Sequence, residues 1–242
     1  MELSRDRGGG SGIWGFELFA AEFCAMLVAE AEEFEASALP RRRPNTMNNF
    51  GLIVNEIGME PLMTSILVHL IAPLAAALFS REPFSTSLDH HHSFLVSYQY
   101  SGGDRGLDMH HDASEVTLNV CLGKRYSGGD LRFCGRFGSA GHRKQECVVA
   151  HSPGRAILHL GRQRHGADEL TSGERLNLVV WARSSAFRAA AAFGHVDPDG
   201  WPKDDEEGEP DRQCLSRAND ADFIEQIRKL RQSGNTYESA SC

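Results

Sequence analysis

The sequence lacks the features of a secreted protein held together by disulfides. Its six cysteines among 242 residues include no Cys-x-x-Cys pair, and four of them lie among apolar or strand-like residues, so we expect reduced thiols. It has no Asn-x-Ser/Thr glycosylation site, and the residues after Met1 lack the apolar run of a secretory signal. These absences favour an intracellular protein of the cytoplasm or the nucleus.

Positive charge and long apolar runs are also scarce. With 25 basic and 33 acidic residues the formal net charge is −8, which repels phosphate backbones, so we expect no nucleic-acid partner. Residues 61–79 form one long, mostly apolar run, which His69 and Pro73 interrupt. We therefore expect a buried helix packed on a sheet and no membrane span. The oligomeric state stays unknown, because no pattern in the sequence indicates it.

Two helices are predicted in the first third of the chain. Apolar residues recur every three or four positions from Phe16 to Phe34, with glutamates between them, as in an amphipathic helix. The second helix begins at Pro61, a residue suited to a first helical turn, and runs to Phe79.

After these helices the spacing of apolar residues changes to every second position. Six such stretches are separated by Gly- and Pro-rich turns: SFLVSYQY, SEVTLNVCL, GGDLRFCG, QECVVAH, RAILHL and RLNLVVWAR. Short strands at this spacing predict an α+β protein with a double-stranded β-helix (jelly-roll) core, on which the N-terminal helices pack. The expected parts are a flexible N-terminus (1–15), a helical support region (16–83), the β-helix core (84–184) and an acidic tail (185–242).

The expected tail differs from the rest in composition. Its segment DPDGWPKDDEEGEPDRQ has eight acidic and two basic residues with few apolar ones. Such a segment cannot bury enough apolar surface to order itself, so we expect disorder, with one short helix over DFIEQIRKLR.

The stretch MHHDASEVTLNVC (109–121) contains a candidate metal site. Residues i and i+2 of an extended segment point the same way, so His110 and Asp112 can converge on one ion while His111 faces away. Imidazole with carboxylate suits iron(II), zinc or manganese, and such a pair needs at least one more ligand. The histidines at 90–92 have no carboxylate at the matching position, and we interpret them as a polar strand start.

Four later histidines are candidates for the third ligand: His142, His151, His159 and His165. The first two flank turns, and the third lies in the apolar run AILHL, where a core histidine is expected. His165 follows a strand and a short turn, and Arg175 opens the final strand ten residues later, with Asn177 on the same face. This context favours His165.

Three protein ligands on one face of an octahedral iron(II) leave three positions, of which a 2-oxo acid can take two and dioxygen the third. A guanidinium at Arg175 can bind the far carboxylate of a five-carbon dicarboxylate through two hydrogen bonds, with Asn177 as an additional donor. Taken alone, such an arginine is more often a surface residue paired with a neighbour such as Glu174 or Glu169.

These residues resemble the iron(II)- and 2-oxoglutarate-dependent dioxygenases of the prolyl and lysyl hydroxylase branch. The resemblance rests on HHDASEVTLNV, YSGGDLRF, SPGRAILHL and RHGADELTSGERLNLVVW, and extends from about Phe16 to Arg183. HHDAS with a following TxNV is similar to procollagen-lysine hydroxylase catalytic domains. RPNTMNNFGLIVNEIGMEPLM is similar to the group called 2-oxoglutarate and iron-dependent oxygenase domain-containing protein 2.

The resemblance implies a specific site. Iron would be held by His110, Asp112 and His165, and 2-oxoglutarate by Arg175. A tyrosine of the strand FLVSYQY would lie near the cosubstrate. Both tyrosines of that strand, Tyr98 and Tyr100, are candidates.

The resemblance also implies a reaction. 2-Oxoglutarate and dioxygen would be consumed, succinate and carbon dioxide released, and a C–H bond of a lysyl or prolyl side chain in a protein or peptide hydroxylated, with ascorbate keeping the iron reduced. The Arg-x-Asn-x-Thr-x-Arg pattern of the nucleic-acid demethylase branch is not matched, because Val179 and Trp181 occupy its last two places. Two alternatives remain open: a metal-binding β-barrel module without oxygenase activity, and a nucleic-acid oxygenase.

Overall fold

The computed structural model describes residues 2–4, 12–137, 139, 141–190 and 210–216. The strands are β1 (Glu2–Ser4), β2 (Ile13–Glu17), β3 (Gly51–Ile53), β4 (His90–Gln99), β5 (Leu107–His110), β6 (Val116–Gly123), β7 (Tyr126–Gly128), β8 (Leu131–Arg136), β9 (Gln145–Val149), β10 (Arg155–Leu160), β11 (Gln163–Ala167) and β12 (Leu170–Arg183). The helices are α1 (Ala21–Ala36), α2 (Glu60–Ile66), α3 (Ala72–Leu78) and α4 (Ser185–Ala189), with a π-helical turn (Leu67–Ile71) joining α2 to α3.

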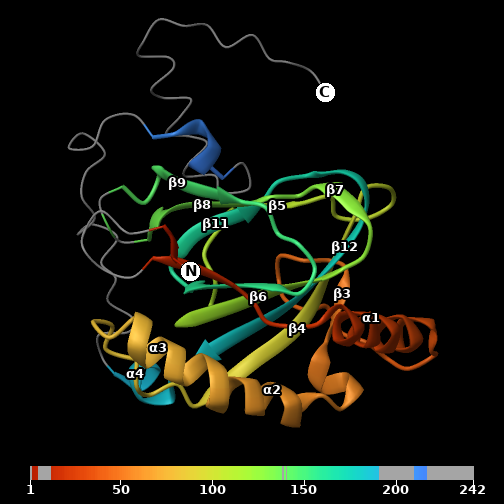
Figure 1. The fold of residues 1–242 in the computed structure, drawn as a ribbon, viewed down its shortest axis with the longest axis horizontal. Helices are drawn as coiled ribbons and strands as arrows, with labels where there is room; N and C mark the ends of the chain where they lie inside the picture. Colours follow the sequence, from red (N-terminus) through yellow and green to blue (C-terminus); the bar gives the residue numbers. More distant parts are fainter. Residues whose placement is uncertain (1, 5–11, 138, 140, 191–209, 217–242) are drawn as a thin grey trace, which may run out of the picture.

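The strands form two antiparallel sheets. The major sheet has the order β1-β2-β10-β6-β12-β4-β3, with β7 paired to β12, and the minor sheet has the order β5-β11-β8-β9. Figure 1 shows the minor sheet above the major sheet and the helices α1, α2 and α3 below it. This arrangement confirms the predicted jelly-roll core with N-terminal helices packed against it.

The two-residue period of the long strands separates two buried layers. In β12, Leu178 and Val180 pack against the helices, whereas Val179 and Trp181 pack between the two sheets. The strands β4 and β6 alternate in the same way, because successive side chains of a strand point to opposite faces. Polar residues at the odd-numbered positions of β6 and β12 therefore point into the space between the sheets.

The N-terminal region differs from its prediction at two points. Within the expected flexible segment 1–15, residues 2–4 form β1, and β2 begins at Ile13, which is 1% exposed. The helix expected from Phe16 begins at Ala21 instead, because Phe16 lies in β2 and pairs with Ala156 of β10. The apolar residues of IWGFELF fit the spacing of a strand as well as that of a helix, and pairing with β10 decides between them.

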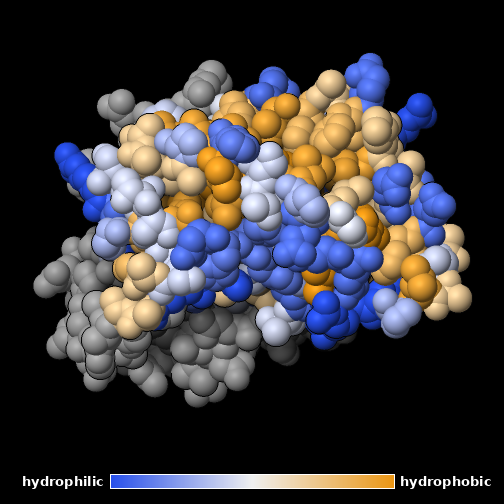
Figure 2. All heavy atoms as spheres, turned by 90° about the horizontal axis from the view of Figure 1, so that it is seen from below, coloured by the Kyte–Doolittle hydropathy of each residue, from blue (hydrophilic) through white to orange (hydrophobic). Residues whose placement is uncertain are grey.

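The second predicted helix is confirmed and runs from Glu60 to Leu78, but it is buried on one side only and not throughout as expected. Residues at four-residue spacing pack on the major sheet: Met63, Leu67, Ile71 and Ala75. By length and composition alone this helix could cross a membrane, a test that the core helices of soluble proteins also pass. Figure 2 views this helix-bearing side of the molecule from below and shows hydrophobic residues on part of its surface.

The expectation of reduced thiols in place of disulfides is wrong for one pair. Cys134 in β8 and Cys214 form a disulfide across a sequence separation of 80 residues, with Cα atoms 5.9 Å apart. No local spacing can reveal such a pair, because only the folded chain brings residue 214 onto the minor sheet. Most of the expected acidic tail and the helix over DFIEQIRKLR lie outside the described residues.

We expect Cys134→Ser to lower the free energy of unfolding by about 2–4 kcal/mol, because the disulfide restricts the unfolded chain over a long loop. Denaturant titration under non-reducing conditions measures this change. The matched control is Cys147→Ser, since Cys147 is a half-buried free thiol on the neighbouring strand β9, and it should change stability by about 1 kcal/mol or less. Equal stability of Cys134→Ser and the parent protein would contradict the disulfide.

Candidate metal and cosubstrate site

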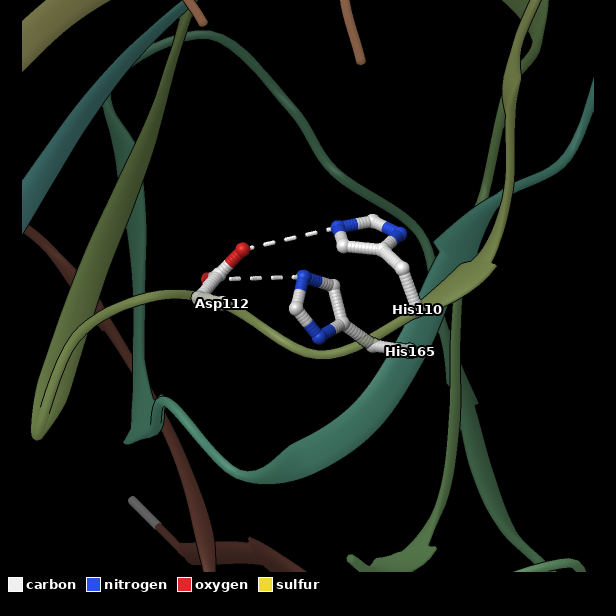
Figure 3. A group of neighbouring side chains, drawn as sticks. All are labelled: His110, Asp112 and His165. Carbon is white, nitrogen blue, oxygen red and sulfur yellow. Dashed lines mark ion pairs between the residues drawn. The ribbon is translucent and has the colours of Figure 1, made fainter. Parts of the chain in front are cut away.

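The predicted ligands His110, Asp112 and His165 come together between the two sheets. His110 ends β5 and is the cross-strand partner of His165 in β11, and Asp112 lies in the turn that follows β5. The Asp112 carboxylate places Oδ1 3.4 Å from His110 Nε2 and Oδ2 3.6 Å from His165 Nε2. One ligand atom from each residue lies within 4.8 Å of the others, and Figure 3 shows the three side chains pointing toward one another.

Hydrogen bonds to the backbone fix the orientation of both imidazoles. His110 Nδ1 donates to the Asp108 carbonyl at 2.7 Å, and His165 Nδ1 donates to the Gln163 carbonyl at 2.8 Å. A carbonyl oxygen can only accept, so each Nδ1 carries the proton and each Nε2 presents a lone pair. Both lone pairs are therefore available to a metal ion, and the same backbone contacts orient metal-bound histidines in proteins generally.

The charges of the site also suit a metal ion. Burial raises the pKa of Asp112, but the adjacent His165 and His110 outweigh this and hold it below its usual range. Burial lowers the pKa of His165 to about 3, although Asp112 opposes the shift. At neutral pH the site thus offers one carboxylate and a neutral imidazole at His165, which are the protonation states that metal binding requires.

A pocket adjoins the three ligands. Apolar and aromatic side chains line most of it: Met47, Phe94, Val96, Tyr98, Leu107, Leu131, Val179 and Trp181. Three amides contribute polar groups, namely Asn45, Asn48 and Asn119. An apolar pocket with a few convergent polar groups is typical of small-molecule and side-chain binding sites.

Arg175 lies in the interior and not in a surface ion pair. It is 1% exposed, its Nη1 donates to the Gly129 carbonyl, and Glu174 instead accepts from Lys124 at 2.9 Å. Within the described part of the chain, Nε and Nη2 of Arg175 are buried without a hydrogen-bond partner. A buried guanidinium with two unused donors is suited to an anionic ligand.

The two candidate tyrosines have different environments. Tyr98 lines the pocket and is buried, with the Arg175 guanidinium carbon 4.7 Å from its ring centroid. Tyr100 is 42% exposed and lies under Arg105 on the surface, because it belongs to the turn after β4. Of the two candidates, Tyr98 is therefore the one that lines the pocket with the metal ligands and contacts Arg175, and Tyr100 is not among the residues of this pocket.

Asn177 lies next to Arg175 on the inner face of β12. Its Nδ2 donates to Asn119 Oδ1 at 2.9 Å, and Asn119 lines the pocket. Its Oδ1 is buried and has no partner in the described residues. Asn177 therefore connects the region of Arg175 to the pocket.

The other histidines that the structure describes are not among the three predicted ligands, and their surroundings differ. His111 points away from the metal ligands and stacks on Phe137, with ring centroids 4.3 Å apart. In the cluster at 90–92, His91 contacts Thr64 and His92 donates to the Pro44 carbonyl, in agreement with a structural role. His159 and His151 are buried beside the site, and burial lowers the pKa of each.

We expect the metal-free protein to lose stability as the pH falls below 6.5. Burial, followed by the charge of Arg175, lowers the pKa of His151 to about 3, so the unfolded chain binds a proton that the folded protein excludes. Between pH 6.5 and 5.5 the binding of this proton to the unfolded chain lowers the free energy of unfolding by about 1 kcal/mol. Denaturant titration of His151→Gln should show a shallower pH dependence than the parent protein, whereas His69→Gln, which removes an exposed histidine, should show none of this change.

Several pocket residues are absent from the sequence-based prediction. Thr117 and Asn119 are recoverable in principle, because the two-residue period within β6 places them on the face opposite the apolar Val116, Leu118 and Val120. The amides Asn45 and Asn48 lie in an irregular loop, where Asn45 Oδ1 accepts from the Met47 and Asn48 amides at 2.8 Å each. Such a loop has no periodicity from which its position could be predicted.

Comparison with known proteins finds relatives that are named as oxygenases. The OGFOD2-like domain family matches residues 5–82. The 2-oxoglutarate and iron-dependent oxygenase domain-containing protein ICU11 of Arabidopsis thaliana is 45% identical over 201 residues, which are 78% of this chain and 49% of that protein. The 2-oxoglutarate and iron-dependent oxygenase domain-containing protein 2 of Homo sapiens is 45% identical over 177 residues, covering 73% of this chain and 50% of that protein. This chain thus spans about half the length of these relatives.

More distant proteins share part of the sequence or the fold. Procollagen-lysine,2-oxoglutarate 5-dioxygenase 1 of Rattus norvegicus is 29% identical over 176 residues, covering 67% of this chain and 22% of that protein. A prolyl hydroxylase from Trichoplax adhaerens, solved with a peptide fragment of the hypoxia inducible factor oxygen degradation domain, aligns with a TM-score of 0.55. That alignment covers 74% of this chain and 86% of the other at 15% identity, a level that establishes a shared fold.

Proposed function

The chain is a relative of the 2-oxoglutarate and iron-dependent oxygenase domain-containing proteins, and from this premise we propose that it is an iron(II)- and 2-oxoglutarate-dependent dioxygenase. Its reaction would hydroxylate a C–H bond of a lysyl or prolyl side chain in a protein or peptide. Dioxygen would be the second cosubstrate, succinate and carbon dioxide the co-products, and ascorbate the reductant. The observation that carries the proposal is the convergence of His110, Asp112 and His165 at a pocket lined by Tyr98, whose ring contacts the buried guanidinium of Arg175.

The residues fit an iron(II) ion. Two imidazole nitrogens with fixed tautomers and one ionised carboxylate form the ligand set of non-haem iron oxygenases, which leaves open positions on the metal. The bound ion would supply the redox chemistry that activates dioxygen. The contribution of the protein is to hold both Nε2 lone pairs toward the metal and to surround them with an apolar pocket that keeps bulk water out.

The residues beyond the metal fit 2-oxoglutarate. Arg175 offers two unused donors to the distal carboxylate, and its burial strengthens the attraction because little water competes. Tyr98 lines the pocket of the metal ligands, and its ring contacts the Arg175 guanidinium from one side. Asn177 is a further polar neighbour of this carboxylate position.

The pocket suits a protein side chain as the hydroxylated group. Aliphatic and aromatic side chains such as Phe94, Val179 and Trp181 would pack against the methylene groups of a lysyl or prolyl residue. The amides Asn45 and Asn48 would bind its polar atoms. The names of two similar proteins, a procollagen-lysine dioxygenase and a prolyl hydroxylase solved with a peptide, support this class of substrate.

The test is succinate formation by protein loaded anaerobically with iron(II), then exposed to air with 2-oxoglutarate, ascorbate and a cell-derived peptide library. We expect peptide products heavier by one oxygen atom, detected by mass spectrometry. His165→Ala is the control, because it removes one metal ligand while leaving Arg175 in place. Metal binding without succinate or oxidised peptide across the library would instead support a binding module without oxygenase activity.

A further inference from the structure

A chain of hydroxyl groups ends on the carboxylate of Asp112. Thr117 Oγ1 lies 2.6 Å from Asp112 Oδ2, and Ser114 Oγ lies 2.7 Å from Thr117 Oγ1. All three residues are buried, with Asp112 7%, Ser114 8% and Thr117 1% exposed. The hydroxyl groups are therefore shielded from water and bonded to each other and to the carboxylate.

The direction of these hydrogen bonds follows from the chemistry of the groups. An ionised carboxylate can only accept, so the Thr117 hydroxyl must donate its one proton to Asp112 Oδ2. Thr117 Oγ1 can then only accept from Ser114, which must donate. Ser114 thus orients the hydroxyl of Thr117, and Thr117 occupies one specific oxygen of the metal-binding carboxylate.

The backbone around these hydrogen-bonded hydroxyl groups lets Ser114 lie close to Gly161. A Cβ atom at position 161 would collide with the carbonyl and hydroxyl oxygens of Ser114, so Gly161 leaves the room that this turn needs. Two further bonds hold the turn: the Asp112 amide donates to the Gly161 carbonyl at 2.8 Å, and the Gly161 amide donates to the Glu115 carbonyl at 3.0 Å. The position of Thr117 relative to Asp112 is consequently fixed by the fold.

The bond from Thr117 makes the two carboxylate oxygens unequal. Without it, each oxygen would face one of the histidine ligands, since Oδ1 lies 3.4 Å from His110 Nε2 and Oδ2 lies 3.6 Å from His165 Nε2. With it, one lone pair of Oδ2 is already used in a short hydrogen bond with a charged acceptor, which is stronger than a bond between neutral groups. The Thr117 hydroxyl thus weakens Oδ2 as a donor to a metal, and Oδ1 becomes the stronger donor of the two.

We infer that Thr117 is a positioning residue that keeps Asp112 bound to the metal through one oxygen. The inference rests on the proposed iron site. Binding through one oxygen leaves three positions of an octahedral ion for cosubstrates, whereas binding through both oxygens would leave two. Since 2-oxoglutarate takes two positions and dioxygen needs one, Thr117 preserves the position on which the proposed reaction depends.

The test counts water ligands on protein loaded with manganese(II) alone, by the line broadening that ¹⁷O-water causes in the electron paramagnetic resonance spectrum. Three exchangeable waters are expected for the parent protein and for Thr117→Ser, which keeps the hydroxyl. Two exchangeable waters are expected for Thr117→Val, which keeps the shape of the side chain but not the hydroxyl. Two are also expected for Thr117→Ala, in which no bulky side chain could itself displace the carboxylate. Three waters in both the valine and the alanine variants would overturn the inference.

A second readout follows the cosubstrate on the manganese(II) protein by calorimetry. The dissociation constant of 2-oxoglutarate should rise at least about tenfold in Thr117→Val and stay within about threefold of the parent value in Thr117→Ser. The water count requires neither 2-oxoglutarate nor turnover. A parent protein that makes no succinate would thus contradict the proposed function, while the count alone decides the role of Thr117.

Discussion

His110→Ala should abolish iron(II) binding and turnover, whereas His111→Ala should retain both. The two residues are adjacent, but His110 Nε2 points toward Asp112 and His165, while the His111 ring stacks on Phe137. Removing one of three protein ligands should weaken iron binding by at least about 100-fold, the upper end of the loss caused by removing an outer contact of a ligand. Anaerobic titration of iron(II) into each variant measures this difference.

Each variant is a control for the other, because both remove one imidazole from the same segment. His111→Ala should lower stability modestly through the lost contact with Phe137, so its melting temperature must be recorded beside its iron affinity. Similar losses of iron affinity in the two folded variants would contradict the assignment of His110 as the ligand. Retention of iron by His110→Ala would contradict the metal site itself.

Arg175→Met should leave iron(II) binding within about threefold of the parent protein but raise the dissociation constant of 2-oxoglutarate by on the order of 100-fold or more. Losing one partner of a buried charged pair costs about 2–5 kcal/mol of binding free energy. In the absence of cosubstrate the same substitution should not lower the melting temperature, because it removes a buried cation with two unpartnered nitrogens. The substitution is therefore predicted to weaken 2-oxoglutarate binding without lowering the stability of the protein.

A matched control for this variant exists on the surface. Arg105 lies over Tyr100 with its guanidinium carbon 4.7 Å from the ring centroid, the same distance as that of Arg175 over Tyr98. Arg105→Met removes the same type of contact without removing a buried charge, so 2-oxoglutarate binding should not change. An equal rise in the dissociation constant for both variants would exclude a specific role of Arg175.

The alternation of residues along strands accounts for most of what the sequence predicts. The two-residue period selects His110 and Asp112 together, and it puts Arg175 and Asn177 on one face of the last strand. The structure brings all four to the space between the sheets, where Arg175 is buried. These features depend on side-chain direction within one strand, which the local sequence determines.

Features that depend on pairing between distant segments could not be predicted. The disulfide between Cys134 and Cys214 and the pairing of β2 with β10 each join segments far apart in the chain. The choice between Tyr98 and Tyr100 depends on where β4 ends, and a boundary of one or two residues cannot be fixed from composition. Local patterns contain no information on these pairings.

The residues before position 84 and the jelly-roll core form one structural unit. β2 pairs with β10, β3 pairs with β4, and the loop that follows Pro44 contributes Asn45, Met47 and Asn48 to the wall of the iron pocket. The residues that match the OGFOD2-like domain therefore contribute part of the wall of the pocket beside the three predicted metal ligands. Substitutions at Asn45, Met47 or Asn48 would change the shape and polarity of this wall without changing a metal ligand.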